Sequence, residues 1–253
     1  MLDCKPAPTP AAMLDLTDPQ LKPGEPLSPA QHELYRKIVA SVLYASNTTR
    51  IDIAYTVGIL SRFISSATTT HLTAAKRLLR YLRGTMDYCL KFEDNDLPDL
   101  ELTVYADSNW AGDKTDRKST SGYLVLLNGN PISWQARKQQ TVALSSTEAE
   151  YQGVSTGACE SIWVNMLLEE MIGNKLLVNF FCDNQAAIAI IRSNNYSERT
   201  KHIDVKHHFI KQLVRNGSIN LQWISTKDQL ADVLTKTLNR ATHVDLTHRI
   251  LAH

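Results

Sequence analysis

The sequence predicts an α/β protein in which a mixed five-stranded sheet is flanked by helices and preceded by a small helical segment. Three observations lead to this fold class. Apolar side chains recur at helical spacing over residues 30–85, three strand patterns with a hairpin signal occupy 101–134, and helical and strand patterns alternate after residue 145. Hairpins followed by alternating units are expected to form a mixed sheet with helices packed on it.

Residues 1–29 are expected to form an extended arm or linker. Seven of the nine prolines in the chain lie between Pro6 and Pro29. Proline-rich stretches favour extended chain because proline has no backbone N–H to donate to a helix or a sheet.

Residues 30–95 are expected to form a segment of three helices. The first carries an apolar stripe from Leu34 to Val42, the second begins near Asp52, and the third runs over about 70–83 and ends at Gly84. The polar face of the third helix is basic, and it is either simply solvated or a stripe that contacts phosphates. The residues on that face proposed as substrate contacts are Arg80 and Arg83.

A polar break at 94–99 marks the boundary to a second domain, expected over 100–240. Its strands are predicted at 101–107, 122–127, from 132, at 176–182 and at 218–224. Its helices are predicted at 145–172, about 184–192, 203–216 and 228–238. Residues 241–253 are expected to be a C-terminal tail.

Four carboxylates stand where this layout would bring them together. Asp107 ends the first strand, Asp183 ends the fourth, Glu150 lies in the first turns of the long helix, and Asp232 lies on the last helix. Parallel first and fourth strands would place their carboxyl ends at one edge, where mixed α/β sheets tend to carry their sites. Taken singly, each residue also has an ordinary role as a turn former, a helix cap or a surface residue.

Carboxylates are the ligands that a two-metal phosphodiester hydrolase needs. Mg²⁺ prefers oxygen ligands, and carboxylates brought together without a cation would repel one another. Two ions about 3.5–4 Å apart can activate a water and stabilise the leaving oxygen of a phosphodiester. The expected cofactor is therefore a pair of Mg²⁺ or Mn²⁺ ions.

Several long motifs of the chain resemble one family, the copia-type retrotransposon Pol polyproteins. Two upstream segments, 34–63 and 71–85, are similar to the last part of the reverse transcriptase of these elements, and the resemblance covers roughly residues 3–240. The segments that resemble their ribonuclease H domain are YADSNWAGDKTDRKSTSGY (105–123), TVALSSTEAEYQ (141–152), FCDNQAAI (181–188), RTKHIDVKHHFI (199–210) and QLADVLTK (229–236).

The resemblance implies a ribonuclease H-like fold and an endonuclease that hydrolyses the RNA strand of RNA–DNA hybrids. The reverse transcriptase polymerase domain would be a further partner, and residues 30–95 would belong to the thumb or connection region. No YVDD-like polymerase motif is present, so the chain alone is not expected to make DNA. The loop Ser225-Thr226-Lys227 also lacks the histidine that many cellular and retroviral ribonucleases H carry, which predicts a lower rate.

The same resemblance assigns the four carboxylates as catalytic metal ligands. Asp107 would bridge both ions, and Glu150, Asp183 and Asp232 would complete the set. Glu148 competes with Glu150 but fits the capping box Ser145-x-x-Glu148 better. Asp228 is the nearest competitor of Asp232.

Several polar residues near the carboxylates are candidate substrate contacts. Gln185 would hydrogen-bond the minor groove of the hybrid, or it is simply a first-turn helix residue. Hydroxyls near Asp107 would donate to phosphates, or they serve only turns and strands. These hydroxyl residues are Ser108, Ser119, Thr120 and Ser121.

Composition restricts the setting more than the activity. The formal net charge of +1 gives no overall polyanion signal, so nucleic-acid binding must rest on local patches. The four cysteines form no CxxC, no apolar run is long enough for a membrane span, and no signal pattern opens the chain. We expect an intracellular, cytoplasmic protein without a membrane partner, and the resemblance implies a retrotransposon particle.

Two other functions stay open at this point. The chain lacks the polymerase core, so it would also fit a catalytically silent remnant that binds nucleic acid or has a structural role. A related nuclease acting on DNA, such as an integrase, is disfavoured by the long copia-like motifs. Carboxylates at all four matched positions favour the hybrid endonuclease.

Overall fold

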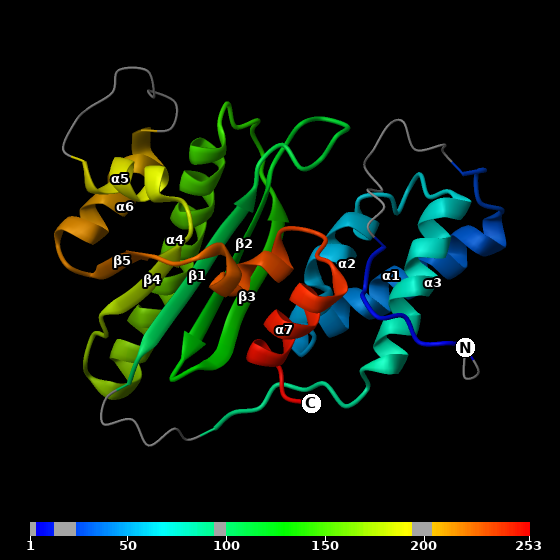
Figure 1. The fold of residues 1–253 in the computed structure, drawn as a ribbon, viewed down its shortest axis with the longest axis horizontal. Coiled ribbons are helices and arrows are strands. Elements are labelled where there is room, and N and C mark those ends of the chain that lie inside the picture. Colours follow the sequence, from blue (N-terminus) through cyan, green and yellow to red (C-terminus); the bar gives the residue numbers. More distant parts are fainter. Residues whose placement is uncertain (1–3, 13–23, 94–99, 194–203) are drawn as a thin grey trace.

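The computed structural model describes residues 4–12, 24–93, 100–193 and 204–253, with only the backbone of 204–208 (Figure 1). The predicted arm is therefore described only in part, because residues 1–3 and 13–23 lie outside these ranges. Within them, no helix is long and apolar enough to cross a membrane. The helices are α1 (Pro29–Thr48), η1 (Ile51–Ile53), α2 (Ala54–Ser61), α3 (Thr69–Gly84), α4 (Ser146–Ile172), α5 (Gln185–Arg192), α6 (Asp204–Arg215), η3 (Thr226–Asp228), η4 (Leu230–Leu234) and α7 (Arg240–Ile250).

The strands form one mixed sheet in the order β3-β2-β1-β4-β5. β1 pairs antiparallel with β2 and parallel with β4, and β5 is parallel to β4. The predicted five-stranded mixed sheet flanked by helices, with a helical segment before it, is confirmed. The strands are β1 (Leu102–Asn109), β2 (Thr120–Leu127), β3 (Asn130–Lys138), β4 (Val178–Cys182) and β5 (Ile219–Trp223).

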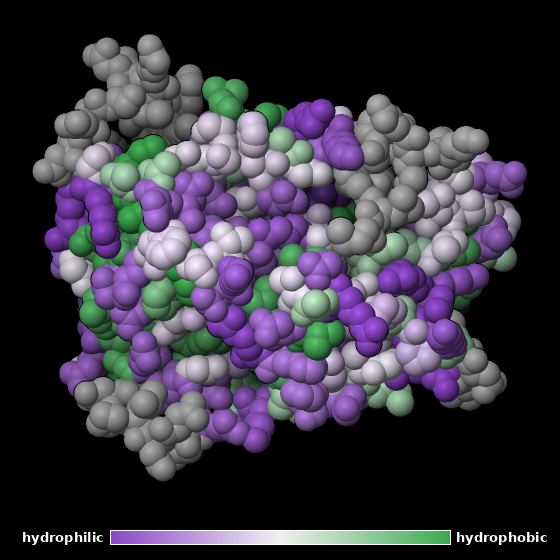
Figure 2. All heavy atoms as spheres, in the orientation of Figure 1, coloured by the Kyte–Doolittle hydropathy of each residue, from purple (hydrophilic) through white to green (hydrophobic). Residues whose placement is uncertain are grey.

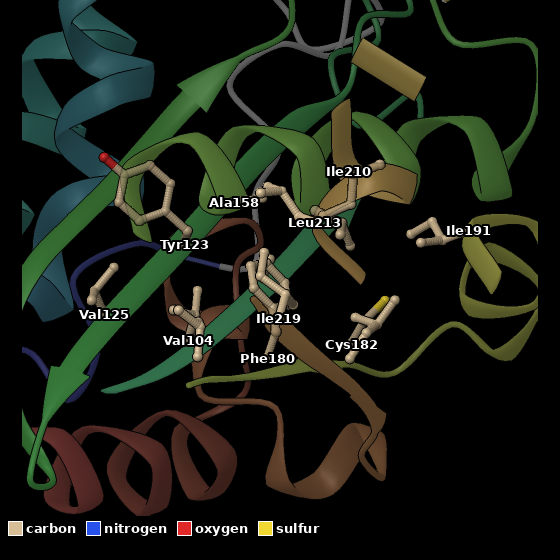
Figure 3. Close-up of a cluster of buried hydrophobic side chains, with 14 of the residues drawn as sticks. Val104, Tyr123, Val125, Ala158, Phe180, Cys182, Ile191, Ile210, Leu213 and Ile219 are labelled. Carbon is tan, nitrogen blue, oxygen red and sulfur yellow. The ribbon is translucent and has the colours of Figure 1, made fainter. Parts of the chain in front are cut away.

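One face of the sheet is covered by α4 with α5 and α6. Alternate residues of the central strands are buried there, because successive side chains of a strand point to opposite faces. Figure 3 shows Val104, Phe180 and Ile219 of three adjacent strands gathered beneath Ala158 of α4. This packing fixes α4 across β1, and so sets where the carboxylate of its N-terminal turns lies.

The opposite face is covered by η4 and α7 together with η1 and α2. Leu124 and Leu126 of β2 share a buried cluster with Ile51, Val233 and Leu246. Figure 2 shows polar and apolar side chains interspersed over the outer side of this layer. The helical segment therefore packs directly on the sheet.

Residues 241–253 differ from the expected tail, because they form most of α7 and pack into this cluster. Asn239 caps the helix by accepting a hydrogen bond from the backbone N–H of Thr242 (3.0 Å). His243 and Thr247 are buried beside Leu246 and Ile250. Two of the buried positions are polar, so the apolar period that identifies a helix is broken.

The helix predicted at 228–238 is also different, since residues 226–234 form the two short 3₁₀ helices η3 and η4. Gln229 between them has an extended backbone, with φ −72° and ψ 97°, and its side chain accepts from the backbone N–H of Ala231 (3.2 Å). Its amide also donates to the carbonyl of Ala106 (3.0 Å). Gln229 therefore anchors η4 against β1.

The three N-terminal helices have a core of their own, built around Tyr35, Val57 and Leu78. Residues 4–12 of the arm lie along α3, where the backbone N–H of Ala7 donates to the carbonyl of Arg80 (3.3 Å). Besides the shared apolar cluster, a hydrogen bond joins these helices to the sheet: the indole of Trp134 in β3 donates to the carbonyl of Ser46 in α1 (2.8 Å).

Gly122 is required where η4 crosses the sheet. It lies opposite Asp107 in the β1–β2 register. An added Cβ would lie 2.6 Å from Leu234 Cβ and 2.9 Å from Thr235 Cγ2. Gly122→Ala is therefore expected to lower the free energy of unfolding by about 1–3 kcal/mol, as overpacking does.

The matched control is Gly58→Ala in α2, where the added Cβ meets only Ala136 O at 3.7 Å. This change should be neutral or stabilising, because glycine in a helix costs about 0.5–1 kcal/mol relative to alanine. Urea unfolding measures both variants. Equal stabilities would contradict the close approach of η4 to β2.

Candidate metal centre and nucleic-acid site

The four predicted carboxylates come from four elements that meet at one end of the sheet. Asp107 is in β1, Asp183 directly follows β4, Glu150 is in the second turn of α4, and Asp232 is in η4. The parallel register pairs Tyr105 with Phe181, so Asp107 and Asp183 lie at corresponding positions two residues further on. Three of the four are buried, with exposed fractions of 2 % for Asp107, 7 % for Glu150 and 4 % for Asp232.

Side chains from the loops after β5 support three of these carboxylates. The Thr235 hydroxyl donates to Asp107 Oδ2. The Thr226 hydroxyl donates to Asp183 Oδ2 (2.9 Å). Lys236 Nζ lies 2.8 Å from Asp232 Oδ1 and 3.7 Å from Asp107 Oδ2. The segment 226–236 thus contacts the carboxylates on both neighbouring strands, Asp107 of β1 and Asp183 after β4.

The electrostatics favour proton uptake by the carboxylates when no cation is bound. Burial, with the charges of Asp107 and Asp183, raises the pKa of Glu150 to about 9. Burial, with the charge of Asp107, raises the pKa of Asp232 to about 7. Burial also raises the pKa of Asp107, and it outweighs the opposing effects of Lys236 and Thr235.

These residues fit divalent metal ions. Glu150 Oε2 is buried and has no hydrogen-bond partner within the described ranges, so it is an oxygen left for a ligand. Ligand atoms of Glu150, Cys182 and Asp183 all lie within 4.8 Å of one another. Carboxylates suit Mg²⁺ and Mn²⁺, whereas the thiol of Cys182 is a softer ligand that these ions do not favour. Cys182 is also fully buried in the apolar cluster under α4, which gives it a packing role.

Asp232 rather than Asp228 lies with the other carboxylates. Asp228 is exposed, accepts from the Ser225 hydroxyl (2.7 Å) and pairs with Arg249 (3.3 Å). Asp232 is buried and interacts electrostatically with Asp107 and Asp183. Glu148, the competitor of Glu150, is likewise engaged outside the site: its carboxylate accepts from the backbone N–H of Leu144 (2.8 Å) at the start of α4.

The hydroxyls proposed as phosphate contacts are buried in the protein. Ser108 and Ser121 hydroxyls bond each other (2.9 Å), and Ser119 accepts from the backbone N–H of Ala111 (3.1 Å). Thr120 is also buried, with Arg62 Nη2 at 3.5 Å. These contacts match the structural alternative, in which the hydroxyls order the strands beside Asp107.

Gln185 and the two arginines differ in where they lie. Gln185 is exposed in the first turn of α5, two residues after Asp183. Arg80 and Arg83 are on α3, which lies at the opposite end of the molecule from α5 (Figure 1). Arg80 Nε donates to the carbonyl of Lys5 (2.6 Å). The structure therefore brings Gln185 to the carboxylates and does not bring the arginines there.

Three side chains that touch the carboxylates were not among the predicted site residues, namely Thr226, Thr235 and Lys236. Thr235 and Lys236 belong to the QLADVLTK motif, so the motif itself was the available signal. Lys236 also follows Asp232 by four residues, which is an ion-pair spacing on a helix. Thr226 could not be found this way, because its contact depends on how the loop after β5 folds back over β4.

Stability without metal is expected to depend on pH through these carboxylates. The folded protein keeps protons on Glu150 up to about pH 9 and on Asp232 up to about pH 7, whereas the unfolded chain releases them near pH 4.5 and 3.8. The free energy of unfolding should therefore fall as the pH rises from about 5 to 9, by on the order of a few kcal/mol. Urea unfolding in EDTA measures this slope. Glu150→Gln should flatten it, and a profile parallel to the wild-type one would contradict the assignment.

Comparison with known proteins decides the family. No family model matches the chain. Over 206 residues the chain is 42 % identical to the retrovirus-related Pol polyprotein from transposon TNT 1-94 of Nicotiana tabacum, covering 81 % of this chain. Over 252 residues it is 39 % identical to the retrovirus-related Pol polyprotein from transposon RE1 of Arabidopsis thaliana, covering 99 % of this chain. The chain is homologous, over most of its length, to part of the copia-type retrotransposon Pol polyproteins.

The chain spans 15–17 % of the length of those two polyproteins. A shorter relative is the secreted RxLR effector protein 161 of Plasmopara viticola, 46 % identical over 132 residues, a match that covers 52 % of this chain and 92 % of that protein. The predicted resemblance to copia-type Pol is confirmed, and the observed mixed sheet flanked by helices is the architecture that this resemblance implied.

Among solved structures, the chain is similar to ribonucleases H. One is the N-terminal ribonuclease H domain of a Mycobacterium tuberculosis protein, with a TM-score of 0.41 and 12 % identity, covering 59 % of this chain and 98 % of that one. Another is LC11-RNase H1, solved in complex with an RNA/DNA hybrid, with a TM-score of 0.40 and 13 % identity, covering 53 % of this chain and 94 % of that one.

Proposed function

We propose that this protein is a metal-dependent endonuclease that hydrolyses the RNA strand of RNA–DNA hybrids. The observation that carries the proposal is the meeting of Asp107, Glu150, Asp183 and Asp232 at one end of the sheet, with a buried Glu150 oxygen that has no partner among the described residues. Homology to retrotransposon Pol polyproteins supports this substrate, because reverse transcription produces an RNA–DNA hybrid.

The four carboxylates would hold two divalent cations, Mg²⁺ or Mn²⁺. In such a site the cations activate a water and stabilise the leaving oxygen of the phosphodiester. Asp107 is held for this role by Thr235, and Asp183 by Thr226. These two hydroxyls keep the carboxylates oriented, so that little rearrangement is needed when substrate arrives.

The exposed surface around Asp183 is where the hybrid would bind. Gln185, which is exposed there, would contact the minor groove, where the 2′-hydroxyls of the RNA strand distinguish it from DNA. The indole of Trp223 donates to the Asp183 carbonyl (3.1 Å), and its ring is half exposed at the same edge. The helices of 30–95 would contact a polymerase domain, and the protein would act in the cytoplasm inside a retrotransposon particle.

The test is cleavage of an end-labelled RNA–DNA hybrid by the purified full chain with Mg²⁺ or Mn²⁺. Expected products carry 5′-phosphate and 3′-hydroxyl ends, EDTA stops the reaction, and double-stranded DNA of the same sequence stays intact. Binding of the hybrid without cleavage would favour the silent nucleic-acid-binding alternative. Cleavage of the DNA duplex would instead favour a nuclease of the same fold with a different substrate.

A further inference from the structure

We propose that Lys236 is a tethered counter-ion of the carboxylate site, which holds Asp107 and Asp232 together without metal and competes with divalent cations for them. The inference rests on the proposed metal centre and adds a residue that sets its affinity. Lys236 would be a positioning residue, since it acts through the carboxylates.

The first argument is contact geometry. Lys236 Nζ lies 2.8 Å from Asp232 Oδ1 and 3.7 Å from Asp107 Oδ2, so one ammonium group contacts two of the four carboxylates. Among the described residues, Lys236 supplies both of the ion pairs that these four carboxylates make. Asp232 Oδ1 has no hydrogen-bond partner in the part of the chain that the structure describes, so the ion pair with Lys236 occupies an oxygen that a cation could otherwise coordinate.

The second argument is charge. Asp107 and Asp232 are almost fully buried, with exposed fractions of 2 % and 4 %, and buried carboxylates near each other repel unless a cation compensates them. Lys236 provides one positive charge at that point. Divalent ions on the same oxygens would be repelled by the ammonium, so lysine and metal oppose each other.

The third argument is that Lys236 is able to move its ammonium group away from the carboxylates. Its backbone is fixed, because its N–H donates to the Asp232 carbonyl (3.2 Å) at the end of η4. Its side chain is 31 % exposed, so the flexible four-carbon stem has a route to solvent. Metal binding would then displace the ammonium without moving the chain that carries Asp232.

The test compares Mn²⁺ affinity in the full chain, by calorimetry and by the paramagnetic resonance signal of free Mn²⁺. Lys236→Met is expected to bind Mn²⁺ about tenfold or more tightly, because the competing charge is gone. Lys236→Arg keeps the charge and should stay close to wild type. Lys138→Met is the matched control, since Lys138 pairs with Asp113 and Asp116 outside the site.

The outcomes separate this inference from the proposed metal centre. Tighter Mn²⁺ binding by Lys236→Met supports the counter-ion. The melting temperature of this variant should then be lower than that of the wild type in EDTA, and Mn²⁺ should raise it by more than it raises that of the wild type. Equal or weaker binding overturns it and leaves the metal centre standing, because a purely structural lysine would not oppose metal. No Mn²⁺ binding by any of the proteins would overturn both.

A measurement on the wild-type chain covers the case in which Lys236→Met does not fold. Amine-reactive labelling followed by mass spectrometry reports how accessible Nζ is, with Lys138 as the internal reference. Saturating Mn²⁺ is expected to increase the labelling of Lys236 relative to Lys138. Unchanged labelling would mean that the ammonium stays in place with metal bound, which contradicts competition.

Discussion

Replacing Asp107 by asparagine is expected to abolish metal-dependent cleavage of the hybrid, with a loss on the order of 10³-fold or more. Asp107 lies centrally in the site, in contact with Thr235 and close to Lys236, and its charge acts on both Glu150 and Asp232. An amide has one oxygen in place of two and no charge, so it is a poor ligand for Mg²⁺. Single-turnover cleavage rates measure the loss.

The Asp107→Asn protein should nevertheless fold at least as well as the wild type without metal. Burial opposes the charge of Asp107, and asparagine removes that charge while it keeps an oxygen that accepts from Thr235. Asp228→Asn is the matched control, because Asp228 is an exposed carboxylate paired with Arg249 and should leave the rate unchanged. Cleavage that survives Asp107→Asn and fails in Asp228→Asn would overturn the assignment of the site.

Replacing Asp52 by alanine is expected to cost about 3–5 kcal/mol of folding free energy. Arg50 Nε and Nη2 donate to the two Asp52 oxygens at 2.9 and 2.7 Å, and the Tyr81 hydroxyl donates to Oδ2 (2.7 Å). The side chains of Arg50 and Asp52 are only 9 % and 1 % exposed. Alanine would leave a buried guanidinium without its carboxylate and a buried hydroxyl without its acceptor.

Glu33→Ala is the control for this ion pair, since Glu33 pairs with Lys37 at 2.6 Å on the surface of α1, with side chains 66 % and 72 % exposed. Exposed pairs at this spacing contribute about 0.3–0.5 kcal/mol. Urea unfolding compares the two variants. Similar losses would show that the Arg50–Asp52 pair is not a buried anchor of the helical segment.

Local patterns predicted most of the elements because those elements present regular faces. Alternation of apolar residues located β1, and Ser145 with Glu148 located the start of α4, where the Ser145 hydroxyl accepts from the Glu148 N–H (3.1 Å). The neighbouring β1 and β4 then placed Asp107 beside Asp183, as the topology required.

What the sequence could not predict depends on contacts between distant segments. α7 has polar residues at buried positions, because His243 packs edge-on against Tyr81 of α3 (ring centroids 5.5 Å apart). The basic face of α3 was open to two interpretations, and in the structure its Arg77 and Arg80 donate to Thr9 and to the carbonyl of Lys5, within residues 4–12 of the arm. The hydrogen bond from Thr226 to Asp183 likewise joins distant segments, so no local sequence pattern predicts it.

The shared cluster of η1, α2, β2, η4 and α7 has a consequence for how the nascent chain folds. Ile51 and Ala54 pack in this cluster with Val233, Leu246 and Ile250, which follow them in the chain by about two hundred residues. Contacts of such long sequence separation slow folding, and apolar surface stays open to chaperones in the meantime. η4 packs in this cluster and carries Asp232, so the carboxylate site is complete only once these distant segments have come together.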